Sequence, residues 1–287
     1  MHEFISVLIS GLSNASVYAL MAMGMALVYG VSKVFNFAYG SFFSLAGYLA
    51  WVLFARGLGY PLVVPIVVAV MFAFGMAADR FLIRPVRVQK EWETLVVIAT
   101  LGIALIIDSA DLIIFGPFLK QLPPLAHGTV SLGGFVVSVQ DIVIFVAAVL
   151  TIAVLLLFLQ MTKPGMAIRA VAQDTDGAQV VGIRHNTVFN YTFAIAAALA
   201  AIAGILLASR YFVSYKVGWD ILLKAWVITA VGGMGSMMGA ALAGVFLALL
   251  EAVVAWRFGA TMTTFVWFAV LIVLFVVRPK GIMGRWG

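Results

Sequence analysis

Two acidic residues three positions apart, Asp108 and Asp111, interrupt an otherwise apolar run of the chain. On a helix this spacing places both carboxyl groups on one face. Carboxyl groups inside a membrane are candidates for function because they are costly to bury, and a pair of them can relay protons. Asp111 lies near the end of the run, where water can reach it. We therefore expect a wet cavity or an interface at this pair in preference to proton coupling.

Other polar side chains in apolar surroundings could line a path for a solute. Asn14 and Tyr18 are four residues apart and share a helix face, although packing against a neighbouring helix is the simpler explanation. Asn36, which has aromatic neighbours, could line such a path or cap a helix. Lys224 could serve the path or could anchor a helix by extending to the membrane surface.

The sequence carries little that could catalyse a reaction. Its three histidines, His2, His127 and His185, are too far apart in sequence for a histidine metal site, and it holds no cysteine. It also lacks the Gly-x-x-x-x-Gly-Lys-Ser/Thr loop that binds nucleotide phosphates, so it cannot hydrolyse ATP by that mechanism. We expect no catalytic residue, no metal site and no bound cofactor in this chain.

The composition indicates an integral membrane protein. Hydrophobic residues make up 65% of the 287 residues and charged residues only 10%, whereas about a quarter of the residues of a soluble domain are charged. The net charge of +6 does not indicate a nucleic-acid partner, because membrane proteins collect lysine and arginine on cytoplasmic loops. The expected surroundings are a lipid bilayer.

Long charge-free runs define the expected membrane spans, each of which needs roughly 20 apolar residues. Seven runs reach that length: 4–32, 34–55, 57–78, 142–162, 186–209, 225–250 and 258–277. An eighth, 94–107, continues to residue 115 if Asp108 and Asp111 lie within the helix. The expected fold is all-α, a polytopic transmembrane bundle of about eight or nine spans that forms one domain over residues 1–287.

Basic loops set the expected orientation. Lysine and arginine cluster after the third span (80–90), after the fifth span (163–184) and after the last span (278–285). We assign these loops and the C-terminus to the cytoplasm, and the N-terminus and the proline-containing loop 116–140 to the outside. Asp79, next to Arg80 at the cytoplasmic end of the third span, is expected to form a local ion pair.

With this orientation the sixth span ends outside, and the last span must begin outside to end in the cytoplasm. Residues 219–256 must therefore enter the membrane and return to the same side. At their centre lies the turn-permissive run Gly232-Gly233-Met234-Gly235-Ser236. The first arm, 219–233, would be about 22 Å long as a helix, which is short of a membrane core of about 30 Å. We predict a broken or re-entrant pair, a feature that often marks a transport path. Two plain short helices joined by a glycine turn remain the alternative.

Residues 161–188 form a polar island between two apolar runs. Pro164 and Gly165 end the preceding helix, three basic residues supply positive charge, and residues 167–181 are expected to form one short helix rich in alanine. A short helix with small side chains fits a groove on another protein. The simpler alternative is an ordinary solvated loop, whose exposed charges contribute little.

Motifs spread in order over nearly the whole chain indicate a known family. They are Asn36-Phe37-Ala38-Tyr39-Gly40, Arg84-Pro85-Val86-Arg87, Gly165-Met166-Ala167-Ile168-Arg169-Ala170 with Asp174 and Gly182, Gly232-Gly233-Met234-Gly235-Ser236, and Arg278-Pro279-Lys280-Gly281. In these motifs the chain resembles the permeases of branched-chain amino acid ABC transporters, and the subunit called LivH more than its partner LivM. It departs from the family at Tyr39, where histidine is usual, and this departure bears on the substrate.

The resemblance implies an ABC importer permease fold in the bacterial inner membrane. It also implies a second, LivM-like permease, two ATP-binding subunits and a periplasmic solute-binding protein as partners. ATP and Mg would be bound by the ATP-binding subunits, so this chain would not be an enzyme. The coupling residues would be Gly165, Arg169, Ala170, Asp174 and Gly182. The candidate residues of the solute path are Asn14, Tyr18, Asn36, Phe37, Tyr39, Gly40, Lys224, Gly232, Gly233 and Gly235.

The expected function is therefore import of branched-chain or other hydrophobic amino acids. Urea, amides and aromatic acids are alternatives, since relatives in the same group carry them. A stand-alone secondary transporter is the alternative from another class, and in it Asp108 and Asp111 would be the coupling groups. The sequence leaves open whether the partner permease is distinct or identical.

Overall fold

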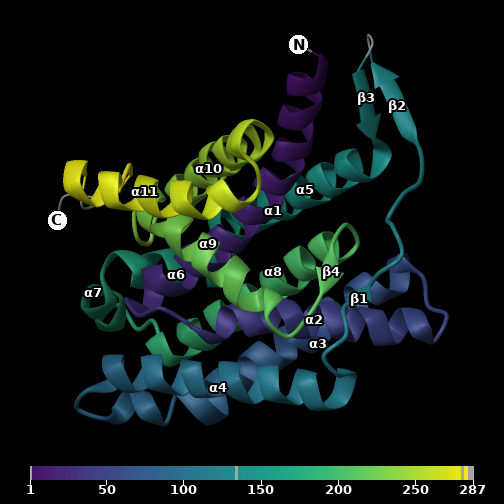
Figure 1. The fold of residues 1–287 in the computed structure, drawn as a ribbon. Helices are drawn as coiled ribbons and strands as arrows, with labels where there is room; N and C mark the ends of the chain where they lie inside the picture. The colour runs from purple at the N-terminus through teal and green to yellow at the C-terminus, as the bar shows by residue number, and fades with distance from the viewer. Residues whose placement is uncertain (1, 133–134, 279–280, 284–287) are drawn as a thin grey trace.

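Long apolar helices make up most of the computed structural model, which describes residues 2–132, 135–278 and 281–283 (Figure 1). The long helices are α1 (His2–Ser32), α2 (Ala38–Ala55), α3 (Tyr60–Ala78), α4 (Trp92–Phe115), α5 (Val139–Met161), α8 (His185–Ala208) and α10 (Met237–Phe258). The shorter helical elements are η1 (Asp79–Ile83), η2 (Val86–Val88), α6 (Lys163–Gln173), α7 (Thr175–Val180), α9 (Val217–Gly232) and α11 (Thr261–Val277). Pro279, Lys280 and Arg285 of the expected basic C-terminus lie outside the described residues.

The few strands lie together at one end of the bundle. Strands β1 (Lys120–Gln121) and β4 (Phe212–Val213) pair in antiparallel fashion, as do β2 (Thr129–Leu132) and β3 (Phe135–Ser138). We call this the hairpin end, and Figure 1 shows α6 and α7 on the far side of the bundle from these strands. The opposite end, with α6, α7 and the η1–η2 loop, is the basic end.

The expectation of a polytopic helical bundle is confirmed. Seven helices in the described part of the chain are long and apolar enough to cross a membrane. They include α4, which continues without a break through Asp108 and Asp111. α11, with 17 residues, and α9, with 16, are shorter. Together these nine helices correspond to the eight or nine expected spans.

The glycine-rich segment is a short helix followed by a long one. α9 has 16 residues, about 24 Å at a rise of about 1.5 Å per residue. α10 has 22 residues and is long enough to span a membrane. Gly233 and Gly235 form the turn between them with φ angles of 104° and 84°, which glycine adopts readily. The first arm is therefore short, as predicted, whereas the second is an ordinary membrane-length helix.

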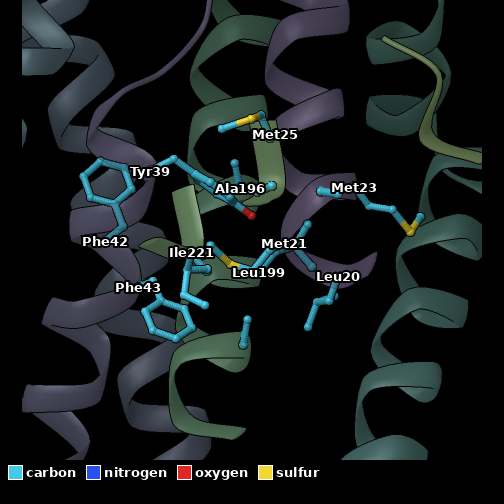
Figure 2. Close-up of a cluster of buried hydrophobic side chains, with 14 of the residues drawn as sticks. Leu20, Met21, Met23, Met25, Tyr39, Phe42, Phe43, Ala196, Leu199 and Ile221 are labelled. Carbon is cyan, nitrogen blue, oxygen red and sulfur yellow. The ribbon is translucent and has the colours of Figure 1, made fainter. Parts of the chain in front are cut away.

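The core lies around α1, which packs against α5, α8, α9 and α10 and is buried over most of its length. Figure 2 shows side chains of α1, α2, α8 and α9 meeting there, among them Leu20, Phe42, Leu199 and Ile221. Because lipid is as apolar as these side chains, the helices associate through close contact and not through the hydrophobic effect.

Glycines allow the closest helix contacts. A Cβ atom on Gly40 of α2 would lie 2.2 Å from the carbonyl oxygen of Gly218 in α9, and one on Gly218 would lie 2.4 Å from that of Gly40. A Cβ on Gly75 of α3 would lie 2.7 Å from the Cβ of Ala197 in α8. These backbones touch, so no larger residue fits at either contact without moving a helix.

Gly40→Ala is expected to destabilise the bundle by about 1–3 kcal/mol, because overpacking forces backbones apart. The matched control is Gly102→Ala on α4, where a Cβ atom meets nothing within 4 Å. That change should leave stability unchanged or raise it by up to about 1 kcal/mol through helix propensity. Thermal unfolding in detergent measures both variants. Equal melting temperatures for Gly40→Ala and the wild type would contradict the packing described here.

Candidate solute path and coupling surface

A cavity of about 320 Å³ lies near the hairpin end, between α1, α2, α8, α9 and α10. We call it the α9 cavity. Its apolar wall comes from Phe43, Leu207, Val213, Val217 and Ile221. Its polar lining consists of Asn14, Tyr18, Ser44, Tyr211, Asp220, Lys224 and Glu251. An apolar hollow with a few convergent polar groups is the usual form of a small-molecule site.

The charged part of this cavity is an ion pair between two helices. Lys224 Nζ of α9 lies 2.7 Å from Glu251 Oε1 of α10 and donates a hydrogen bond of 2.8 Å to the hydroxyl of Tyr18 on α1. The ammonium also lies 4.8 Å from the ring centroid of Tyr18 and 5.6 Å from that of Trp267. Three helices thus place their polar groups at one point. Sequence reasoning found Lys224 and Tyr18 but missed Glu251 as their partner.

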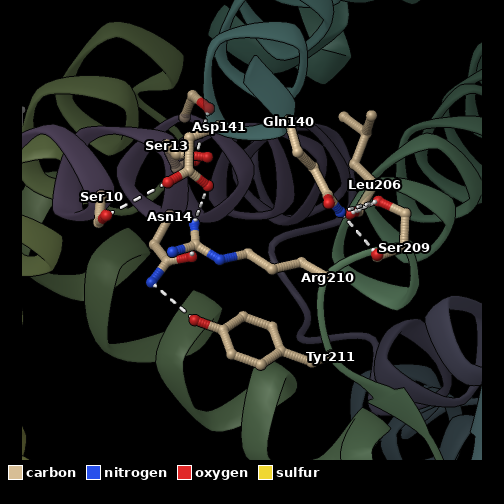
Figure 3. Close-up of polar contacts among 10 residues, drawn as sticks. Ser10, Ser13, Asn14, Gln140, Asp141, Leu206, Ser209, Arg210 and Tyr211 are labelled. Atoms are coloured by element: carbon tan, nitrogen blue, oxygen red, sulfur yellow. Dashed lines mark hydrogen bonds and ion pairs between the residues drawn. The ribbon is translucent and has the colours of Figure 1, made fainter. Parts of the chain in front are cut away.

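A polar network holds the elements at the hairpin end (Figure 3). Arg210 Nη1 lies 2.8 Å from Asp141 Oδ1 and donates to Asn14 Oδ1 at 3.3 Å. The same carboxyl group accepts from the Ser10 hydroxyl at 3.2 Å, and Asn14 Nδ2 donates to the Tyr211 hydroxyl at 3.3 Å. The network ties α1 and α5 to the segment that follows α8. Asn14 therefore belongs both to the network and to the cavity lining.

The first-loop residues lie elsewhere. Asn36 is buried, and its Oδ1 accepts from the backbone N–H of Ala38 at 3.0 Å, a capping contact at the start of α2. The backbone N–H of Phe37 donates to Thr100 Oγ1 at 3.3 Å. Tyr39 is fully buried beside Gly24 in the core. None of these three side chains lines the α9 cavity, and their part in transport stays a prediction.

The glycines of the candidate path also lie away from this cavity. Gly40 contacts Gly218, as described above. Gly232 packs against Gly239 across the α9–α10 turn, where a Cβ atom would lie 2.4 Å from a backbone carbon. Gly233 and Gly235 shape that turn at the basic end. Of the ten candidate path residues, the structure brings together Asn14, Tyr18 and Lys224.

The acidic pair in α4 does not lie in water. Asp111 is 1% exposed, so of the wet cavity and the interface expected for this pair, the structure favours the interface. Asp108 Oδ2 accepts a hydrogen bond of 2.6 Å from Trp219 Nε1, which links α4 to α9. Neither residue lines the α9 cavity. Within the described residues, no group of three histidine or acidic side chains is placed to hold a metal ion.

The polar island folds as two helices. The Thr162 hydroxyl accepts from the N–H of Gly165 at 3.1 Å, and Pro164 occupies the first turn of α6. Asp174 Oδ1 accepts from two backbone N–H groups at 3.0 Å and thereby starts α7. The prediction of one helix over 167–181 is therefore wrong, because Asp174 caps a second helix. Pro164 follows α5 and lies in the first turn of α6, a position that proline commonly occupies.

The coupling residues differ in exposure. Gly165 is buried against α5, where a Cβ atom would lie 2.3 Å from the Phe158 carbonyl oxygen. Ala170 is half-buried, whereas Arg169, Asp174 and Gly182 are exposed. Gly182 has a φ angle of 87° and follows α7.

An apolar groove of about 400 Å³ lies between α6 and α8. Its lining includes Pro164, Ala167 and Ile183 with Lys163 and Arg184. We call the groove, together with the exposed residues of α6 and α7, the coupling surface. Its small apolar hollow with positive charge beside it suits a protein partner.

The coupling surface is joined to the glycine turn. Lys33, which directly follows α1 and has a φ angle of 57°, donates from Nζ to the carbonyl oxygen of Ala172 in α6 at 3.2 Å. A Cβ on Gly30 of α1 would lie 3.5 Å from the carbonyl oxygen of Gly235 and 3.8 Å from the Cβ of Ala172. The backbone N–H of Ile282 donates to the Val231 carbonyl at 2.8 Å. Helix α6, the end of α1 and the α9–α10 turn therefore meet at the basic end.

The expected pair between Asp79 and Arg80 does not form. Asp79 Oδ1 instead lies 2.5 Å from Arg87 Nη2, and its Oδ2 accepts from Asn190 Nδ2 at 3.2 Å. The Arg87 guanidinium also lies 4.2 Å from the ring centroid of Phe189. Burial lowers the pKa of Arg87 from its ordinary value, and the Asp79 carboxylate opposes that shift. Arg87 is favoured because the η1 and η2 turns bring it back to the buried carboxyl group, whereas Arg80 is exposed.

Residues 7–276 match the family described as "Branched-chain amino acid transport system / permease component". The chain belongs to this family. It is 33% identical to the high-affinity branched-chain amino acid transport system permease protein BraD of Pseudomonas aeruginosa, over 99% of this chain and 97% of that protein. It is 30% identical to LivH of Escherichia coli K12, a permease protein of the same description, over 98% and 96% of the two chains.

A solved structure supports the fold. "PsaBC from Streptococcus pneumoniae in complex with Fab" aligns with 98% of this chain and 93% of its own at a TM-score of 0.53, with 12% sequence identity. At that identity the similarity concerns the fold alone. The resemblance stated from the motifs is confirmed, and this chain is a transport permease subunit and not an enzyme.

Asp141→Asn is expected to destabilise the protein by about 1–3 kcal/mol, because the charge of Arg210 stays partly buried without its partner. The double variant Asp141→Asn/Arg210→Gln removes both charges and should unfold no earlier than either single variant. Asp176→Asn, at an exposed position, is the control and should change stability by less than about 0.5 kcal/mol. Thermal unfolding in detergent gives these values. Strictly additive losses in the double variant would show that the pair is not coupled.

Proposed function

We propose that this chain is the permease subunit of an ATP-driven ABC importer for branched-chain or other hydrophobic amino acids. The observation that carries the proposal is the family match over residues 7–276. Two relatives that the chain matches over nearly its full length, BraD and LivH, are named as permeases for branched-chain amino acids. The chain would supply the solute path and dock the subunits that hydrolyse ATP.

The α9 cavity supports this choice of solute. Its wall is apolar, and two of its three charged groups, Lys224 and Glu251, form an ion pair at one place. A branched-chain amino acid has the same division into an apolar side chain and two charged groups on one carbon. Urea and simple amides lack the apolar part, so the wall of this cavity offers them little.

The coupling surface supports an external source of energy. The chain lacks a phosphate-binding loop, so ATP and Mg would be held by two partner ATP-binding subunits. Their closure would press on α6 and α7. The contacts from Lys33 to Ala172 and from Gly30 to Gly235 would then carry the movement to α1 and to the α9–α10 turn.

The basic residues support the orientation. Lys33, the η1–η2 loop and the coupling surface share the basic end of the bundle, and lysine and arginine favour the cytoplasmic side. We therefore assign the basic end and the C-terminus to the cytoplasm of a bacterial inner membrane. The hairpin end would face a periplasmic solute-binding protein, and a second, LivM-like permease would complete the path.

Arg169→Glu is expected to weaken the binding of the ATP-binding subunits more than about tenfold, because reversing this charge turns its contact with the partner surface into a like-charge contact. Such a contact costs several kcal/mol, and about 1.4 kcal/mol corresponds to a factor of ten. The tagged chain is co-expressed with the partner subunits, captured in a gentle detergent, and the ATPase activity of the eluate is measured. Lys216→Glu makes the same charge change at an exposed position near the hairpin end and should leave the yield unchanged. If the wild-type chain elutes without an ATPase, the proposed function fails.

A further inference from the structure

Lys224 and Glu251 form an ion pair that is open to the α9 cavity. The side chain of Lys224 is 25% exposed and that of Glu251 is 19% exposed, and both line the α9 cavity. A pair that served only to join α9 to α10 would gain nothing from this opening. Ion pairs removed from water seldom stabilise a fold more than apolar side chains of similar size do, which favours a role beyond packing.

Each member of the pair has unused hydrogen-bonding capacity. Glu251 Oε1 contacts Lys224, whereas its Oε2 is buried and has no hydrogen-bond partner among the described residues. A buried acceptor without a hydrogen-bond partner destabilises a fold. The ammonium of Lys224 carries three donors, and the structure uses two of them, on Glu251 and on Tyr18, which leaves one. The site therefore has an acceptor, and a donor beside it, for a ligand that offers both.

The charges of the pair define which ligand fits. Lys224 and Glu251 together are neutral, so a neutral zwitterion can insert between them and leave no charge unmatched. A solute with one net charge would leave one member of the pair, or itself, uncompensated in a poorly solvated place. Asp220 also lines this cavity, but it is exposed and water screens its charge.

We infer that Lys224 and Glu251 form the binding site for the two charged groups of an apolar amino acid. Lys224 takes the carboxylate of the solute, and the Glu251 carboxyl group, on a side chain that is 19% exposed and lines the cavity, takes its ammonium group. The side chain of the solute then lies against Phe43, Val213 and Ile221 on the apolar wall. The cavity of about 320 Å³ lies at the lower end of the range of about 300–1,000 Å³ for small-molecule sites. This inference rests on the proposed function, since it names the contacts made by the solute of that transporter.

The test measures binding of radiolabelled leucine to the purified complex with its partner permease and ATP-binding subunits, without the solute-binding protein. Two competitors each lack one charged group of leucine: 4-methylpentanoate has no ammonium group, and 3-methylbutylamine has no carboxylate. The wild-type complex is expected to bind leucine at least about tenfold more tightly than either competitor, which corresponds to about 1.4 kcal/mol.

The variants are expected to reverse the preference between the two competitors. Lys224→Met leaves the Glu251 carboxylate unpaired, so this variant should bind leucine about tenfold more weakly than the wild type does. It should also prefer 3-methylbutylamine, whose ammonium group can pair with that carboxylate. Glu251→Gln leaves the Lys224 ammonium unpaired and should prefer 4-methylpentanoate. Lys216→Met and Glu93→Gln, at exposed positions outside the cavity, are the matched controls and should behave as the wild type. If the ion pair were purely structural, these substitutions would lower the stability of the protein without reversing the preference between the competitors.

A second measurement leaves the pair intact, in case either single variant fails to fold. The chain has no cysteine, so Val217→Cys places a single thiol in this subunit, on the wall of the α9 cavity. Leucine should slow its modification by a thiol reagent at least about fivefold at saturation, whereas the two competitors should not at the same concentration. Equal modification rates with and without leucine, or an unchanged order of preference in both folded variants, overturn the inference.

The failure of the inference and that of the proposed function are distinguishable. ATP-driven leucine uptake by proteoliposomes that hold the whole system, including the solute-binding protein, tests the proposed function alone. If uptake occurs but the binding preferences do not depend on Lys224 and Glu251, the importer is correct and the site is wrong. If the wild-type system moves no solute with ATP, both are wrong.

Discussion

Backbone contact between helices at glycine and alanine is the constraint on which this structure depends. Gly244 of α10 lies against Ala19 of α1, and the Gly40–Gly218 contact joins α2 to α9. Within lipid there is no hydrophobic force between helices, so association relies on such close approach and on hydrogen bonds between helices. The α9 cavity is an opening in this packing, lined by the long side chains of Lys224 and Glu251 together with the small residues Gly47, Gly204 and Ala208.

Helix α9 links α2, the α9 cavity and the glycine turn at the basic end. Its first turn touches α2 through Gly218, its middle carries Lys224 into the cavity, and its end reaches the glycine turn at the basic end. The same helix is linked to α4 through the bond between Trp219 and Asp108. Because α9 is short and bounded by a glycine turn, a displacement of the turn can reach the cavity by moving one rigid helix.

The sequence predicted the helices well and the contacts between them poorly. Charge-free runs of sufficient length determine the spans, and glycine determines the α9–α10 turn, because both effects are local. The choice of ionic partner is not local. Arg210 with Asp141, and Lys224 with Glu251, join residues that are distant along the chain. Their pairing depends on how each helix is rotated, and helices that are apolar on every face give no periodic signal of that rotation.

Three differences between the expected and the observed structure have separate physical causes. Asp79 was expected to pair with the neighbouring Arg80, but the η1 and η2 turns bring Arg87 to it instead. For Asp111 both a wet cavity and an interface were expected, and tertiary packing covers this residue, which leaves the interface. The single helix expected over 167–181 is split because the Asp174 side chain accepts from backbone N–H groups and thereby starts a second helix. An aspartate within such a run can either lie in one continuous helix or cap a new one, so the sequence alone does not decide between them.

The most direct test of this account is an electron cryomicroscopy map of the assembled transporter in lipid, determined with leucine and with ATP hydrolysis blocked. The account predicts density for leucine in the α9 cavity, with its charged groups at Lys224 and Glu251 and its side chain on the apolar wall. Density for leucine elsewhere, such as between the two permeases and out of contact with Lys224, would contradict it.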